Sequence, residues 1–228
     1  MKCLIVNGDD FGASRGINRG IVEAHQRGIL TSASLLVNAP WSGEAAILSR
    51  LVPRLSVGLH VHLPNDRTAI PAGADSCRAD LRRQFTRFQA LMGHAPTHLD
   101  SHHDAHHAPH WLPYFRAFAR EHHLTLRGYS SIRCYTKFYG QWRGESHPEQ
   151  ISAASLARML IAEVDDGITE FSCHPGYIDP DLSSSYVIER EIELRSLCDP
   201  MMGQVVSEHS IRLINHCEAD SLIVSSQG

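Results

Sequence analysis

Short apolar runs alternate with segments of helical periodicity along most of the chain, and this alternation constrains the fold most strongly. The runs at residues 2–7, 55–63 and 168–173 have the length of buried strands. Between them lie segments with apolar residues at helical spacing, of which residues 78–92 are the clearest. Strands that alternate with helices usually form a parallel sheet. The sequence therefore predicts an α/β fold, either an α/β barrel or a large open sheet.

The expected elements follow one another without a visible repeat or boundary, so residues 1–228 are expected to form a single domain. Strands are expected over residues 2–7, 31–37, 55–63, 96–100, 124–127, 168–173 and 211–215. Helices are expected over residues 15–27, 41–51, 78–92, 109–123, 152–164 and 186–198, with a helix end at 204–210. Residues 64–77 and 128–150 are expected to be irregular, and a loop as long as the second is usually functional or mobile.

Composition excludes several classes of partner. Hydrophobic residues make up 43% of the chain, which suits an ordinary core, and every apolar run is far shorter than the roughly 20 residues of a membrane span. The net charge is −4 without a basic stripe, so nucleic acid is not an expected partner. The six cysteines form no CxxC pair, and no signal-peptide pattern opens the sequence. We therefore expect a cytoplasmic protein with reduced thiols.

Side chains typical of metal and catalytic sites stand at the C-terminal ends of the expected strands. In chain order they are Asp9, Asp10, His60, His62, Asp100, His102, Arg127 and His174. The C-terminal ends of parallel strands meet at one rim, where α/β folds place their active sites. We expect these side chains to meet in one site.

The densest chemistry lies in residues 97–110, where six of fourteen residues are His and two are Asp. An extended backbone would point His98, Asp100 and His102 to one side. His102 and His106 would share a face if a helix began there. Imidazole and carboxylate together suit a divalent metal ion. The other interpretation is a solvated polar loop.

An aspartate pair with histidines from two or three strands can form a mononuclear metal site with open positions for water and a substrate oxygen. A spare carboxylate can accept a proton and a histidine on another strand can return one, which fits hydrolysis of an amide or ester. One alternative is a metal-dependent phosphoesterase, although such enzymes usually need more carboxylate ligands. Another is a protein that binds sugar or metal without catalysis.

Each candidate also has a purely structural interpretation. Asp9 or Asp10 could cap the first helix, His60 could be a satisfied interior histidine, and His174 could be a turn residue. A thiol nucleophile would have to be Cys173, beside His174, but adjacent residues of a strand point to opposite faces.

Four segments resemble the motifs of the YdjC-like carbohydrate deacetylases, a family with chitooligosaccharide and hopanoid-associated members. They are VNGDDFG at 6–12, GLHVHL at 58–63, THLDSHHDAH at 97–106 and FSCHPGYID at 171–179. The resemblance implies a distorted (β/α) barrel of the polysaccharide-deacetylase type, with parallel strands and the site at their C-terminal ends. It also implies removal of an N-acetyl group from an amino sugar, and a homodimer is plausible on the same ground.

Carried over residue by residue, the resemblance implies that Asp10, His60 and His102 hold one divalent ion, either magnesium or zinc. It further implies that Asp9 is the general base and His174 the general acid.

Arg127 is where the family often has an arginine near the substrate, so the resemblance implies that it binds substrate. Two positions depart from the family pattern: Asp104 replaces a third consecutive histidine, and His62 replaces a residue that is not expected to be a ligand. The resemblance assigns no role to His62, His103, Asp104, His106 or the aromatic segment 129–142.

Overall fold

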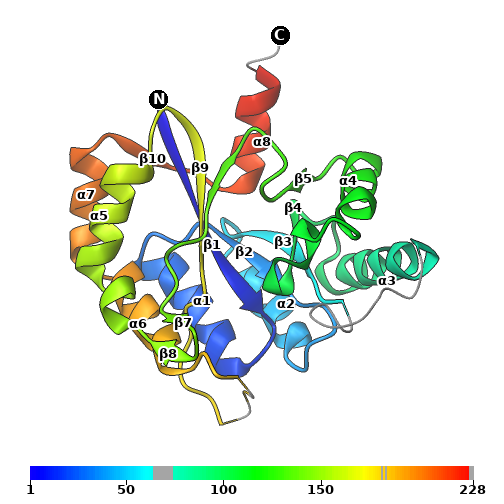
Figure 1. Ribbon diagram of the computed structural model, residues 1–228, viewed down its shortest axis with the longest axis horizontal. Coiled ribbons are helices and arrows are strands. Elements are labelled where there is room, and N and C mark those ends of the chain that lie inside the picture. The colour runs from blue at the N-terminus through cyan, green and yellow to red at the C-terminus, as the bar shows by residue number, and fades with distance from the viewer. Residues whose placement is uncertain (64–73, 181, 183, 226–228) are drawn as a thin grey trace.

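The protein is described by a computed structural model that covers residues 1–63, 74–180, 182 and 184–225. Most of the segment expected to be irregular at 64–77 lies outside these residues. Eight strands form one sheet in the order β5-β4-β3-β2-β1-β9-β6, with β10 paired to β1 (Figure 1). Their bounds are β1 Lys2–Phe11, β2 Ser32–Leu35, β3 Ser56–Val61, β4 His98–Ser101, β5 Thr125–Leu126, β6 Arg133–Tyr135, β9 Gly167–Cys173 and β10 Ile211–Leu213.

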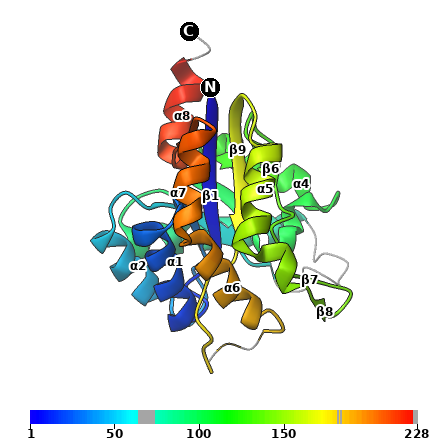
Figure 2. The same ribbon diagram turned by 90° about the vertical axis from the view of Figure 1, so that its left-hand side faces the viewer.

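Every pairing in this sheet is parallel. The end strands β5 and β6 do not pair with each other within the described residues, so the curved sheet forms an open barrel. This confirms the prediction of a distorted barrel of parallel strands. The central strand β1 pairs along its length with β9, and the two run side by side in Figure 2.

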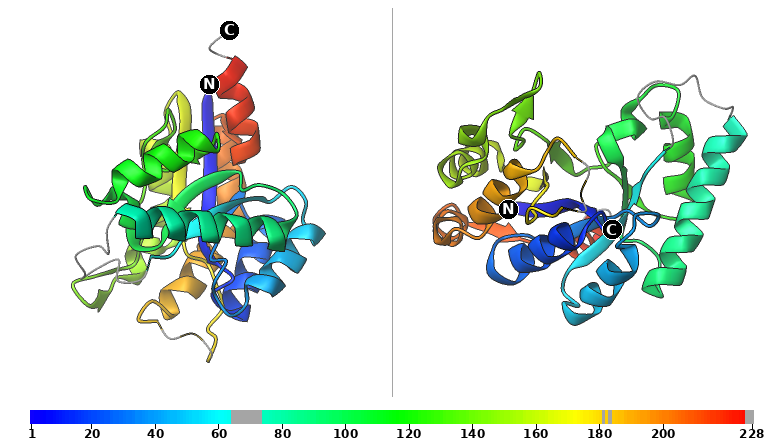
Figure 3. Two further views of the ribbon diagram at one scale, coloured as in Figure 1. Left: turned by 90° about the vertical axis from the view of Figure 1, so that its right-hand side faces the viewer. Right: turned by 90° about the horizontal axis from the view of Figure 1, so that it is seen from below.

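The helices cover the outside of the curved sheet. They are α1 Arg15–Arg27, α2 Ser42–Leu51, α3 Ala74–Met92, α4 Leu112–Glu121, α5 Ala153–Glu163, α6 Ile188–Leu197, α7 Pro200–Glu208 and α8 His216–Ser225. Seven of them contact one another in the order α4, α3, α2, α1, α6, α5, α7, which gives the arc in the right-hand view of Figure 3. No helix within the described ranges is both long enough and apolar enough to cross a membrane.

Helix α1 shows how the sequence places a segment of the site. Its N-cap Ser14 accepts a hydrogen bond from the backbone N–H of Ile17, and this bond caps the start of the helix. Gly16 and Gly20 let the loop after β9 approach closely, because a Cβ at Gly20 would lie 2.5 Å from the Cα of Gly176. This packing fixes the loop that begins at His174.

The first strand is longer than predicted, and the difference matters for the site. The expected strand ends at residue 7, but β1 continues through Asp9 and Asp10 to Phe11. Its register with β2 shifts between Gly8 and Phe11, and Asp10 has a φ of 68°. Such an irregularity redirects side chains that would otherwise alternate. Both aspartates consequently line the same cavity.

The segment 128–150 was predicted to be irregular, and this is wrong in part. It contains β6, the hairpin β7 Gln141–Trp142 and β8 Glu145–Ser146, and the 3₁₀ helix η2 Pro148–Ile151. These elements are two to four residues long, too short to leave a periodic signal. The helix end expected at 204–210 is likewise a full helix, α7, capped by Asp199, and α8 was not predicted.

Candidate functional site

A cavity of about 630 Å³ opens at the C-terminal ends of the strands. Of the eight side chains expected to meet in one site, Asp100 contacts His60 Nδ1 at 2.8 Å, and the ring centroid of His62 lies 5.4 Å from that of His102. The other six line the cavity: Asp9, Asp10, His60, His102, Arg127 and His174. They come from the ends of β1, β3, β4, β5 and β9, as expected for a parallel α/β fold.

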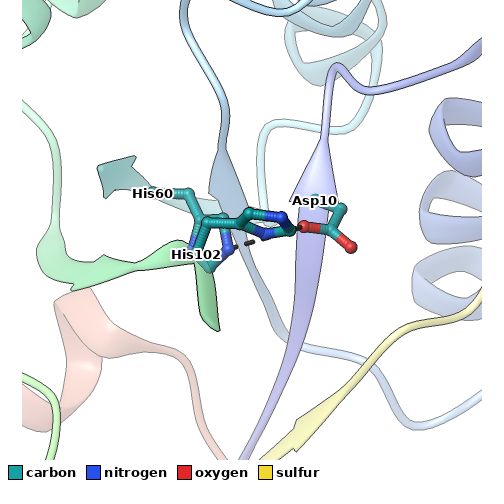
Figure 4. A group of neighbouring side chains, drawn as sticks. All are labelled: Asp10, His60 and His102. Carbon is teal, nitrogen blue, oxygen red and sulfur yellow. Dashed lines mark ion pairs between the residues drawn. The ribbon is translucent and has the colours of Figure 1, made fainter. Parts of the chain in front are cut away.

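Asp10, His60 and His102 converge on one point in this cavity (Figure 4). Asp10 Oδ1 lies 3.0 Å from His102 Nδ1 and 3.5 Å from His60 Nε2. One potential ligand atom from each residue lies within 4.8 Å of the other two. Asp10 and His60 are buried, whereas the side chain of His102 is 26% exposed. The group therefore has one side open to the cavity.

This arrangement fits a divalent metal ion. Asp10 Oδ1 is buried and has no hydrogen-bond partner in the part of the chain that the structure describes, although two imidazole nitrogens face it. Two imidazoles and a carboxylate are a common three-residue ligand set for zinc, with further positions open for water and substrate. The donor atoms thus match the divalent metal ion that the sequence implies.

Asp100 orients His60 for this role. Its Oδ1 lies 2.8 Å from His60 Nδ1, which directs Nε2 toward Asp10. Metal-binding histidines commonly have such a carboxylate on the other ring nitrogen. Burial opposes protonation of His60, but Asp100, Asp10 and Asp9 raise its pKa to about 10. A divalent ion would supply positive charge among these carboxylates in place of that proton.

Arg190 holds the other oxygen of Asp10. Its Nη2 donates to Asp10 Oδ2 at 2.6 Å, and both side chains are buried. Burial alone would raise the pKa of Asp10, but Arg190 and the two histidines hold it well below the usual range. Asp10 is therefore an ionised carboxylate, and its Oδ1 faces the imidazoles of His60 and His102.

Asp9 is held by a different arginine. Arg127 donates to both of its oxygens at 2.8 Å, and Asn7 Nδ2 donates to Oδ1 at 2.8 Å. Burial would raise the pKa of Asp9, but the charge and hydrogen bonds of Arg127 lower it. Asp9 is thus a rigid, ionised carboxylate beside the three converging ligands.

Arg127 is the centre of a buried charge cluster. Besides Asp9, its guanidinium contacts Asp100 Oδ2 at 2.7 Å and Glu170 Oε1 at 2.8 Å. Burial raises the pKa of Glu170 to about 7, and Arg127 opposes this rise. The guanidinium lines the cavity, but three carboxylates already engage it.

His174 lies between Asp9 and the buried carboxyl of Glu193. Its Nε2 lies 4.0 Å from Asp9 Oδ2, and its Nδ1 lies 4.0 Å from Glu193 Oε1. Glu193 is fully buried, accepts hydrogen bonds from the backbone N–H of His174 and from the hydroxyl of Tyr186, and has its pKa raised to about 8 by burial. Burial lowers the pKa of His174 to about 4, so its resting form is neutral.

The predicted spacing of His98, Asp100 and His102 is confirmed in part. His98 Nε2 and Asp100 Oδ2 lie 3.0 and 2.6 Å from the hydroxyl of Ser34, so these two side chains point to one side of β4. His102 begins the 3₁₀ helix η1 His102–His107 instead and turns toward Asp10.

His102 and His106 do not share a helical face. His103 and Asp104 have φ angles of 54° and 53°, which interrupts η1 between them. His106 turns inward, where its Nδ1 lies 2.7 Å from Ser101 Oγ. The regular helix on which the prediction depended does not form.

Cys173 is unsuited to nucleophilic chemistry. Its thiol donates to the backbone carbonyl of Asn7 at 3.2 Å, and burial raises its pKa well above the ordinary value. The side chain is fully buried, whereas His174 lines the cavity, as the alternation along a strand predicts.

The aromatic segment 129–142 contributes both to the core and to the wall of the cavity. Phe138 is buried and anchors the segment, while Tyr139 stacks on Tyr186 with ring centroids 4.5 Å apart and lines the cavity. Trp142, at the hairpin, stacks on His147 and is exposed.

Sequence reasoning missed Arg190 and Glu193, which hold Asp10 and His174. Both lie on α6, where charged residues at helical spacing look like a solvated face. Glu170 was also missed, although a carboxylate in the middle of an apolar strand is a signal, because such residues are seldom buried unpaired.

The sequence and the fold are similar to those of known proteins. The sequence matches the family model described as YdjC-like protein over residues 3–208. A carbohydrate deacetylase of Geobacillus stearothermophilus is 35% identical, over 95% of this chain and 98% of the relative. A chitooligosaccharide deacetylase of Serratia marcescens is 33% identical, over 93% and 97%.

Solved structures show the same fold. A putative cellobiose-phosphate cleavage protein from Enterococcus faecalis superposes with a TM-score of 0.81 at 25% identity, over 95% of this chain and 98% of that one. A family 4 acetyl xylan esterase from Clostridium thermocellum, in complex with a cobalt ion, gives a TM-score of 0.61 at 14% identity, over 97% and 91%. The second likeness concerns the fold alone.

Proposed function

This chain belongs to the YdjC-like protein family, and from that premise we propose that it is a metal-dependent hydrolase that removes the N-acetyl group of an amino sugar and releases acetate. The observation that carries the proposal is the convergence of Asp10, His60 and His102 beside an ionised Asp9 in one cavity. The relatives named as deacetylases of carbohydrates and chitooligosaccharides support an N-acetylglucosamine-containing substrate.

In this proposal Asp10, His60 and His102 hold one divalent ion, and their two imidazoles favour zinc over magnesium. Such an ion, when bound, lowers the pKa of a water molecule and polarises the acetyl carbonyl. Asp100 and Arg190 keep the ligands oriented through His60 Nδ1 and Asp10 Oδ2.

Asp9 is the general base. Arg127 and Asn7 fix its orientation and keep it ionised, so it can accept a proton from the attacking water. The role of Arg127 is therefore to position Asp9, and direct contact with substrate remains a prediction for this residue.

His174 is the general acid that protonates the departing amine. Its pKa of about 4 means that it is neutral at rest, so the proton must be gained during the reaction. Asp9, whose Oδ2 is 4.0 Å from His174 Nε2, is near enough to pass on the proton that it accepts. The stacked rings of Tyr139 and Tyr186 form a wall near His174 against which a sugar ring can pack.

Incubation with N-acetylglucosamine, its disaccharide and a lipid-linked form is expected to release acetate from at least one of them. Treatment with a chelator should abolish this release, and zinc should restore it, because the three ligands hold the ion that activates water. Acetate is measured by a coupled enzyme assay. Release of phosphate from sugar phosphates without acetate would support a phosphoesterase, and tight sugar binding without turnover would support a binding protein; either result would contradict the proposal.

Glu193→Gln is expected to lower kcat by at least about 10-fold, with little change in KM. The upper limit is the roughly 10²–10⁴-fold that a general acid contributes. The amide has one accepting oxygen, so it cannot accept both of the hydrogen bonds that Glu193 receives from the His174 backbone and the Tyr186 hydroxyl. Steady-state kinetics measure the effect, with Glu191→Gln on the same helix, where Glu191 pairs with Arg195, as control. Equal activity of the two variants would remove Glu193 from the account.

A further inference from the structure

A second group of metal-ligating side chains lies in η1, between β4 and α4 (Figure 1). Asp104, His106 and His107 each place one potential ligand atom within 4.8 Å of the other two. None of these residues belongs to the group of Asp10, His60 and His102. Asp104 also lines the cavity, so the second group lies at its rim.

His106 is the residue that points to a ligand. It is fully buried, and its Nε2 has no hydrogen bond of normal geometry among residues 1–63, 74–180, 182 and 184–225, although the backbone of Arg127 lies near the ring. A buried polar atom without a partner is uncommon unless water or an ion completes it. Burial, together with the charge of His107, lowers the pKa of His106 to about 3, so the ring is neutral, the form that binds metal.

The other ring nitrogen of His106 is held as in a metal-binding histidine. Nδ1 lies 2.7 Å from Ser101 Oγ, which also accepts the backbone N–H of His106 at 2.9 Å. An Nδ1–H that donates to this hydroxyl leaves the lone pair on Nε2. Such a contact to the other ring nitrogen fixes the tautomer and orientation of histidine ligands.

Asp104 and His107, whose side chains are exposed, can complete the site. Bonds of about 2.1 Å in a tetrahedral site place ligand atoms about 3.4 Å apart. The three potential ligand atoms lie no more than 4.8 Å from one another, so any pair of them must approach by at most about 1.4 Å to bind one ion. The Nδ1 of His107 lies 3.0 Å from the hydroxyl of Tyr129, and this contact keeps the His107 ring beside Asp104 and His106.

We propose that Asp104, His106 and His107 form a second binding site for a divalent ion of the zinc class, at the cavity rim. Two imidazoles and one carboxylate favour zinc, cobalt or nickel over magnesium and calcium, which prefer oxygen ligands. The site is independent of the proposed deacetylation, because it shares no ligand with the group that would activate water.

The test is the number of zinc ions bound per chain, measured by equilibrium dialysis and elemental analysis of the full-length protein. Wild type is expected to bind two ions. The double variant Asp104→Asn with His107→Gln should bind one, and so should Asp10→Asn, which removes the other ion. Because Asp104 and His107 are exposed, the double variant should keep the wild-type circular dichroism spectrum.

The matched control is His110→Gln, an exposed histidine of the same segment, which should still bind two ions. A single ion in the wild type that the double variant retains would overturn the proposal. So would a second ion that persists in the Asp104→Asn, His107→Gln variant, because it would then be bound elsewhere on this histidine-rich chain. Loss of acetate release alone would not affect the result, since zinc is counted without substrate.

Discussion

An Asp9→Asn variant is expected to deacetylate its substrate roughly 10²–10⁴-fold more slowly than wild type, while it binds its metal ion normally. The substitution keeps the size of the side chain but removes the negative charge that accepts the proton of the attacking water. Asp9 is not one of the three side chains, Asp10, His60 and His102, that are proposed to hold the ion (Figure 4), so the affinity for the ion should change little. The measurements are kcat for acetate release and the metal content of the purified variant.

The control for this substitution is Asp165→Asn, a change to an exposed aspartate remote from the cavity whose partner is Arg133. It should leave kcat unchanged. Wild-type turnover in Asp9→Asn would refute the role of general base. Loss of the ion together with activity would instead mean that Asp9 is a ligand, which also contradicts the account.

Arg127→Met should lower the free energy of unfolding by about 3–5 kcal/mol, the usual cost of removing one partner from a buried ion pair. The variant leaves Asp9, Asp100 and Glu170 buried without their common cation. For a chain of this size, the loss corresponds to a fall in Tm of roughly 6–20 °C. Thermal unfolding followed by circular dichroism measures it.

Arg133→Met provides the matched control, because Arg133 forms an exposed pair with Asp165 at 3.5 Å. Such pairs contribute about 0–1 kcal/mol, so this variant should unfold near the wild-type temperature. The Tm of Arg127→Lys should lie between those of the two methionine variants, since lysine keeps the charge but loses the bidentate contact with Asp9. Equal stability of Arg127→Met and Arg133→Met would show that the buried cluster does not depend on Arg127.

The sequence was sufficient to predict the fold and to select residues that line one cavity. The fold was predictable because strands and helices alternate in a pattern with few arrangements. Asp10, His60 and His102 were among eight candidates at the ends of apolar runs, which parallel strands bring to one rim. The family resemblance then singled out these three as the expected metal ligands. The structure brings these three together.

The supporting residues could not be predicted in the same way. Arg190 and Glu193 reach the cavity from a helix whose periodicity gives no reason to separate them from surface charges. The irregularity at Asp10 depends on pairing with β2, which is a tertiary contact. Short strands such as β6 depend on a neighbour, here β9, and not on their own composition.

Anomalous diffraction at the zinc absorption edge, from crystals of the protein grown with zinc, tests the central claim most directly. The account predicts a peak about 2.0–2.2 Å from an oxygen of Asp10, a ring nitrogen of His60 and a ring nitrogen of His102. A fully occupied zinc ion bound elsewhere, with no peak among these three side chains, would contradict it.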